Sequence, residues 1–194
     1  MLTDRIIGAF TFRSGVYKEV EEDTTFTTTA WLLVIVIGFL NQLGSHASRN
    51  LINWLGGAVV GTIFVVLGFA VGAFVVNWVG RTVFNADVTF DELVRTLGLA
   101  YVWNIVGVIG ALAAFSSALS CLLTPAVVIA GIAGFLAWLV AAKEALDLEW
   151  VQTIVTVILG WVAMAIITIV VAGIVLTALG LGGLAVGGLT SLIR

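Results

Sequence analysis

Few side chains in this sequence could carry chemistry. The chain of 194 residues contains one histidine, His46, and one cysteine, Cys121. A single neutral imidazole nitrogen could bind a metal or a pigment axially. No second ligand stands near His46, so we expect an interfacial histidine and no cofactor or metal. No Ser/His/Asp set, phosphate-binding loop or paired carboxylate occurs in a suitable context, and we predict that the protein is not an enzyme.

The composition restricts the class of protein further. Hydrophobic residues make up 61% of the chain and charged residues only 10%, with a formal net charge of -3. A soluble domain carries about 25% charged residues. This chain cannot cover itself with a wettable surface, and it has no basic excess. The composition therefore excludes a water-soluble enzyme, a disordered regulator and a nucleic-acid-binding protein. We predict an all-α, polytopic transmembrane helical bundle.

Uncharged stretches between clusters of charge define the spans. About 20 apolar residues cross the hydrocarbon core of a bilayer. On this basis we predict five spans, near residues 29–43, 53–79, 97–117, 124–142 and 151–177. Pro125 is expected in the first turn of the fourth span, because proline lacks an N–H group. Residues 1–28 precede the transmembrane domain of residues 29–177. The glycine-rich tail of residues 178–194 is short for a sixth span, and we expect it to be re-entrant or interfacial.

Basic residues in the loops predict the orientation. Six lie on the side of the N-terminus, namely Arg5, Arg13, Lys18, Arg81, Arg95 and Lys143. Only Arg49 and Arg194 lie on the other side. Basic residues are enriched in cytoplasmic loops, so the N-terminus is expected in the cytoplasm.

Two segments outside the spans have amphipathic patterns. Residues 3–20 are expected to form a helix on the inner leaflet, which the acidic run of residues 19–23 would end. A loosely ordered tail is the alternative. Thr89 and Glu92 have the spacing of a capping box, which predicts an interfacial helix running into the third span.

The glycines and polar residues of the predicted spans indicate helix packing. No acidic or basic residue lies inside them, which argues against a proton-driven transporter or pump. The second span carries two small-xxx-small pairs, formed by Gly57, Gly61, Gly68 and Gly72. Such a face lets another backbone approach closely, and we expect packing within the chain more than dimerisation. Asn104 is central enough to hydrogen-bond across helices.

Four short sequence motifs resemble those of bacterial Yip1-domain membrane proteins. They are RIIGAF at 5–10, GVYKEVEED at 15–23, GRTVF at 80–84 and AAKEALD at 141–147. The resemblance extends over about residues 4–175. It implies a five-span helical protein of the bacterial cytoplasmic membrane with a cytoplasmic N-terminus. Eukaryotic members are associated with small GTPases, but their Asp-Leu-Tyr-Gly-Pro type motif is absent here, and Leu99 stands where tyrosine is typical. We therefore do not expect small-GTPase binding.

The sequence thus favours a non-enzymatic membrane scaffold or accessory subunit, within a larger complex that could be energy-transducing. Its expected partners are the lipid bilayer and other membrane subunits or a second copy. The alternative is a transporter of lipid or a neutral solute, or a membrane-shaping, trafficking-like protein. A cavity reaching the midplane and lined by Asn104 and the threonines of the spans would favour transport, whereas a solidly packed bundle would argue against it.

Overall fold

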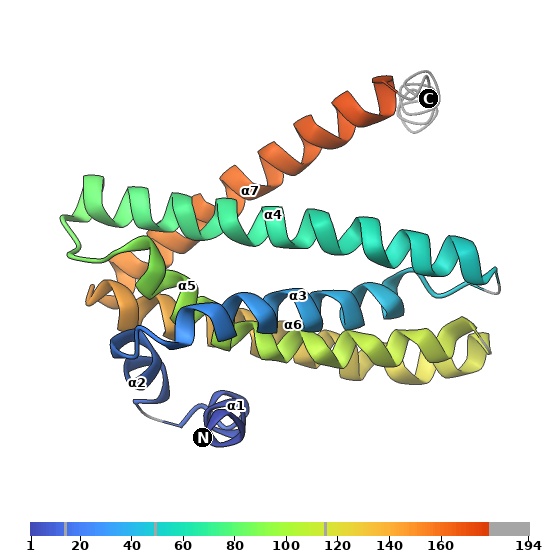
Figure 1. The fold of residues 1–194 in the computed structure, drawn as a ribbon, viewed down its shortest axis with the longest axis horizontal. Coiled ribbons are helices and arrows are strands. Elements are labelled where there is room, and N and C mark those ends of the chain that lie inside the picture. The colour runs from blue at the N-terminus through green and yellow to red at the C-terminus, as the bar shows by residue number, and fades with distance from the viewer. Residues whose placement is uncertain (14, 49, 115, 179–194) are drawn as a thin grey trace.

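A computed structural model describes residues 1–13, 15–48, 50–114 and 116–178 (Figure 1). The elements in chain order are α1 (Leu2–Phe10), α2 (Val16–Glu22), α3 (Phe26–Ser45), α4 (Leu51–Phe84), α5 (Phe90–Ala100), the 3-10 helix η1 (Tyr101–Ala114), α6 (Ser117–Leu146) and α7 (Trp150–Ala178). Within these residues there is no β-strand. The predicted tail at 178–194 lies outside the described residues except for its first residue.

Five helical segments in the described residues are long and apolar enough to span a membrane, which confirms the predicted all-α bundle. They are Phe26–Ser45, Leu51–Phe84, Phe90–Leu112, Cys121–Leu146 and Trp150–Ile167. Four of them lie roughly side by side in Figure 1, whereas α7 diverges from α4 toward the C-terminus. Most helices extend beyond the predicted spans, because polar residues continue them outside the apolar stretch. The third segment instead ends at Ala114, before the predicted limit of 117. The third begins at Phe90, seven residues before the predicted limit of 97.

Pro125 lies inside α6 and not in a first turn, so that prediction is wrong. The helix already begins at Ser117, because Leu119, Leu122 and Leu123 continue its apolar surface. Proline removes one backbone hydrogen bond, but membrane helices tolerate it when nearby groups satisfy the freed carbonyl.

The third span changes its winding at Tyr101, where α5 continues directly into η1. A 3-10 helix has three residues per turn, so side chains three apart in sequence eclipse one another. Tyr101, Asn104, Gly107 and Gly110 therefore lie on one face of η1. This face meets α3, and an α-helical pattern would not have grouped these residues.

The N-terminal segment forms two helices instead of the single predicted helix over 3–20. The chain turns between them, with Phe12 and Gly15 at φ of 51° and 81°. Figure 1 looks down the axis of α1, which therefore runs across the bundle as an interfacial helix would. The acidic run of residues 19–23 largely belongs to α2 and does not end the first helix. Val16, Tyr17 and Val20 are buried against the bundle, and not on a leaflet.

The best-packed part of the core lies at one end of the bundle. Its largest fully buried side chains come mainly from α2, α5 and the end of α6, and include Tyr17, Leu93, Leu97, Leu99 and Leu146. We call this end, comprising α1, α2, the loop of residues 85–89, the start of α5 and residues 143–149, the charged platform.

Helix α5 begins with a capping box. The Glu92 backbone N–H donates to Thr89 Oγ1 at 3.3 Å, and the Thr89 N–H donates to the Glu92 carboxylate at 2.7 Å. Two of the backbone N–H groups that lack an intrahelical partner at the start of α5 are satisfied in this way.

Replacing Thr89 with alanine removes the acceptor and is expected to destabilise the protein by about 1 kcal/mol. Unfolding in detergent by added SDS, followed by circular dichroism, measures the change. The exposed Thr82 on α4 gives the matched control, since Thr82→Ala removes no cap. Equal stability of both variants would contradict a capping role.

Candidate functional site

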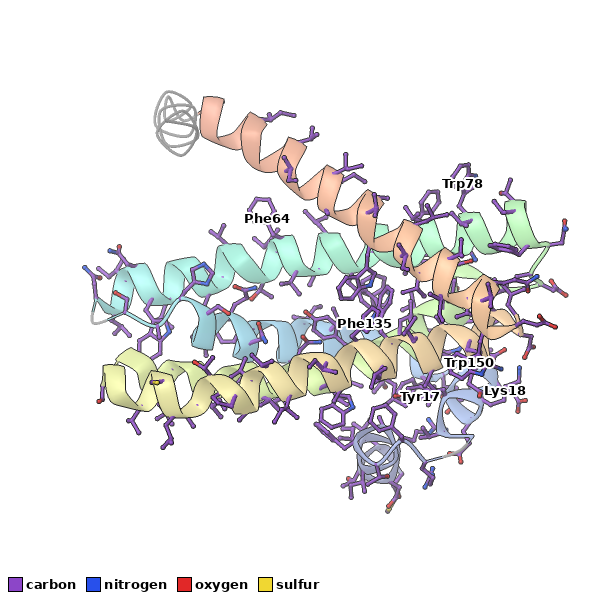
Figure 2. All side chains as sticks on the ribbon, turned by 180° about the vertical axis from the view of Figure 1, so that it is seen from behind. Tyr17, Lys18, Phe64, Trp78, Phe135 and Trp150 are labelled. Carbon is purple, nitrogen blue, oxygen red and sulfur yellow. The ribbon has the colours of Figure 1, made fainter. Side chains whose placement is uncertain are left out.

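A cavity of about 420 Å³ lies between α3, α4, η1, α6 and α7. Six of its lining residues are aromatic, namely Phe64, Phe69, Tyr101, Phe135, Trp138 and Trp161. Figure 2 labels Phe64 on α4 and Phe135 on α6, the helices of two opposite walls. The lining positions fall near the middle of α4, α6 and α7. The cavity therefore lies at the depth of the hydrocarbon core.

Edge-to-face ring contacts hold the walls of the cavity in place. The rings of Phe69 and Tyr101 join α4 to η1, with centroids 5.9 Å apart at 79°. Trp161 on α7 contacts Phe135 and Trp138 on α6, with centroids 5.2 Å and 6.1 Å away. Aromatic pairs favour this geometry, which stabilises them beyond the area they bury.

Glycines keep the space between these rings open. Gly61 and Gly68 line the cavity from α4, and Gly131 and Gly134 line it from α6. A Cβ atom at Gly131 would meet no heavy atom within 4 Å. A side chain at this position would therefore enter open space.

Three polar side chains line the cavity, from Gln42, Tyr101 and Asn104. The Asn104 amide donates to the Tyr101 carbonyl at 3.2 Å, within its own helix. The bond across helices runs instead from the Asn41 amide to the Asn104 backbone carbonyl, at 2.8 Å. The interhelical hydrogen bond expected at Asn104 is therefore made by its backbone carbonyl, whereas its side-chain amide bonds within η1. Asn41 is the partner that sequence reasoning missed.

The glycines of the second span lie on α4 as predicted and face other parts of the same chain. A Cβ atom at Gly57 would lie 2.9 Å from the His46 ring, and one at Gly61 would lie 2.5 Å from Gln42. The carbonyl of Gly72 lies beside Gly160 of α7. With Gly68 on the cavity wall, the glycine face of α4 is covered by α3 and α7 or borders the cavity.

The closest approach of two backbones occurs elsewhere, between α3 and η1. A Cβ atom at Gly44 would collide with the carbonyl oxygen of Gly107. A Cβ atom at Gly110 would come within 3.0 Å of the Gly44 carbonyl. Sequence reasoning missed this contact. The signal for it was the three-residue spacing of Asn104, Gly107 and Gly110.

His46 ends α3, and its Nδ1 lies 3.2 Å from the Gln42 carbonyl oxygen. It is exposed. Among the described residues no group of three or more His, Cys, Asp or Glu side chains could hold a metal ion.

Arg95 fastens α2 to the bundle. Its side chain is on α5 and is only 4% exposed. Its guanidinium donates to the carbonyls of Val20 and Glu21 and to Thr27 Oγ1. These carbonyls belong to the last turn of α2, where a cation also favours the helix dipole. Arg95 lies outside the predicted span 97–117, and its loop-like position in the sequence hid this role.

Ion pairs hold the rest of the charged platform together. Lys18 on α2 contacts Asp147 after α6 at 3.2 Å and Glu21 at 3.0 Å, and Arg5 contacts Asp23 at 2.8 Å. Figure 2 labels Lys18 and Trp150, the first residue of α7, at this same end of the bundle.

These contacts and the burial of the side chains shift the pKa values of three platform residues. Burial lowers the pKa of Lys18, but hydrogen bonds to Glu21 and Asp147 outweigh it and raise that pKa. Burial raises the pKa of Glu21. Hydrogen bonds from Thr25 and Arg5 lower the pKa of Asp23. The platform therefore keeps Lys18 and Asp23 charged near neutral pH.

Two chemical capacities follow from this geometry. The cavity offers an apolar space with a few neutral polar groups, and the platform offers a charged surface at one end of the bundle.

A family model described as the Yip1 domain matches residues 7–181. No curated protein and no solved structure matches the chain.

Proposed function

Because the chain belongs to the Yip1 domain family, we propose that this integral membrane protein is a non-enzymatic scaffold or accessory subunit. It joins a larger membrane assembly, such as an energy-transducing complex, in the cytoplasmic membrane of a bacterium. Its N-terminus and charged platform face the cytoplasm. The six basic residues on the platform side support this orientation.

The observation that carries the proposal is how the platform is built. Arg95 and Lys18 tie α2 to α5 and to the end of α6, which are distant in sequence, and Arg5 ties α1 to the end of α2. Side chains used in this way stabilise a fixed surface. Exposed carboxylates such as Glu22 and Asp87 remain on that surface. A rigid, charged surface on a membrane anchor suits docking of another subunit.

The glycine face of α4 is a less suitable docking surface. Gly57 and Gly61 contact side chains of the α3 region, and Gly72 contacts α7. We therefore assign partner binding to the platform. Small GTPases and nucleic acids are not among the proposed partners.

Mild detergent extraction followed by a native gel and mass spectrometry tests the scaffold role. We expect a species larger than the monomer, with a second protein that co-purifies. The charge-reversed variant Glu22→Lys/Asp87→Lys should lose that protein, whereas Glu22→Gln should retain most of it, because one neutralised rim charge changes affinity little. A lone monomer without co-purifying protein would refute the role.

The cavity favours a second candidate, the handling of lipid or a neutral solute. Asn104 lines the cavity at mid-depth, as such a role requires. Thr153 and Thr156 do not line it; their hydroxyls donate to carbonyls within the first turns of α7. Transfer of a fluorescent lipid between leaflets of proteoliposomes tests this candidate, and rates equal to those of protein-free vesicles would contradict it. Membrane shaping is a related alternative, because a helix such as α1 that lies in the membrane interface could act on the bilayer.

A further inference from the structure

We propose that the cavity between α4 and α6 is a binding site for an uncharged lipid alcohol that enters from the bilayer. The site goes beyond the scaffold role and does not depend on it, since its test contains no other protein. Three features carry the proposal: the position of the opening, the unmet hydrogen-bonding groups of the wall, and the absence of charge among the described lining residues.

The opening faces the lipid. Phe64 and Trp161 line the cavity and are 37% and 41% exposed. Gly131, on the opposite wall, is exposed as well. All three lie near the middle of helices long enough to cross a membrane. A ligand at this depth therefore arrives laterally from the hydrocarbon region, which favours a mostly apolar molecule.

The wall carries polar groups with unused hydrogen-bonding capacity. Among the residues that the structure describes, neither the Gln42 amide nor the Tyr101 hydroxyl has a hydrogen-bond partner. Asn104 uses an N–H of its amide, and the amide oxygen remains as an acceptor. Water that could satisfy such groups is scarce in the hydrocarbon core, where unsatisfied groups are costly.

These groups define the chemistry of the ligand. Gln42 and Tyr101 can donate, while Gln42 and Asn104 can accept. A hydroxyl both donates and accepts, so it matches this set better than an ether or a hydrocarbon. Six aromatic side chains around it suit a long apolar chain or ring system.

The lack of charged side chains in the described part of the cavity wall argues against phospholipids as ligands. Among the described lining residues none is acidic or basic. A phosphate group in the cavity would be buried without a counter-charge, which is strongly unfavourable. The polar group of the ligand is therefore a neutral hydroxyl.

Photo-crosslinking of the full chain in lipid nanodiscs tests the site. The probe is a long-chain fatty alcohol that carries a diazirine and a terminal alkyne. We expect cross-links on peptides of α4, α6 and α7 that line the cavity, and competition by excess unlabelled fatty alcohol. Cross-links spread evenly over the lipid-facing helices, without competition, would overturn the proposal.

Two glycines provide a matched pair of variants. Gly131→Phe places a ring in the cavity and is expected to reduce labelling about tenfold or more, because it removes the space for the ligand. Gly56→Phe makes the same change at a position that also has no heavy atom within 4 Å but lies outside the cavity lining. It should label like the parent chain. Equal labelling of both variants would overturn the site.

A comparison of three probes on the unaltered chain tests the chemical class of the ligand. The methyl ether of the same probe and a diazirine-bearing phosphatidic acid should each label the cavity peptides about fivefold less, the effect of roughly one lost hydrogen bond or more. Gln42→Leu should reduce labelling by the alcohol to a similar extent. Equal labelling by all three probes would overturn the assignment to an uncharged alcohol.

Discussion

Substituting alanine for Gly44 is expected to destabilise the bundle by about 3 kcal/mol, at the upper end of the range for overpacking. The new Cβ atom would collide with the Gly107 carbonyl oxygen, which belongs to the backbone of η1 and cannot rotate away. The two backbones would have to separate, and the Asn41–Asn104 hydrogen bond of 2.8 Å would be strained with them. Unfolding in mixed detergent and SDS micelles, followed by tryptophan fluorescence, measures the loss.

Gly56 supplies the control for this substitution, because a Cβ atom there meets no heavy atom within 4 Å. Alanine is favoured over glycine in a helix, so Gly56→Ala should be stabilising by about 0.5–1 kcal/mol. The two variants are thus expected to change stability in opposite directions. A Gly44→Ala protein as stable as Gly56→Ala would show that α3 and η1 do not approach as closely as described.

The contrast between these glycines shows what the sequence could predict. The five spans follow from uncharged stretches, since hydrocarbon tolerates few charges, and the Yip1 resemblance follows from short sequence words. The glycines of α4 were recognised because their spacing fits an α-helix. Gly44 and Gly107 were missed because their contact depends on the 3-10 winding of η1, which places residues three apart on one face. The three-residue spacing of Asn104, Gly107 and Gly110 is compatible with this winding, but whether it forms is decided by packing against α3.

In the cavity and the platform too, the sequence predicted individual residues and helices but not the contacts between helices. Asn104 was identified as a central polar residue, but its use depends on Asn41 and Gln42, which approach from another helix. The helix over 3–20 was predicted from amphipathic spacing alone. It breaks because the buried surface of α2 matches α5 and α6, and the turn at Gly15 brings the two together. Helix identity follows from composition, whereas contacts between helices follow from how their surfaces fit.

Replacing Arg95 with methionine is expected to release α2 from the bundle and to destabilise the platform by about 3 kcal/mol, since hydrogen bonds to charged groups contribute about 1.5–3 kcal/mol each. Methionine keeps much of the side-chain volume but cannot donate. The carbonyls of Val20 and Glu21 would lose their donor at the end of α2. Amide hydrogen exchange in α2 should then accelerate about a hundredfold, as local opening becomes easier.

Two further arginine variants separate hydrogen bonding from charge. Arg95→Lys keeps the positive charge near the C-terminal end of α2 but lacks the planar fork that reaches several acceptors, so an intermediate loss is expected. Arg81 on α4 is exposed, and Arg81→Met should leave exchange in α2 unchanged. If Arg95→Met and Arg81→Met give the same exchange rates, the guanidinium does not hold α2. A graded series from arginine through lysine to methionine would instead show that the guanidinium of Arg95 holds α2 against α5.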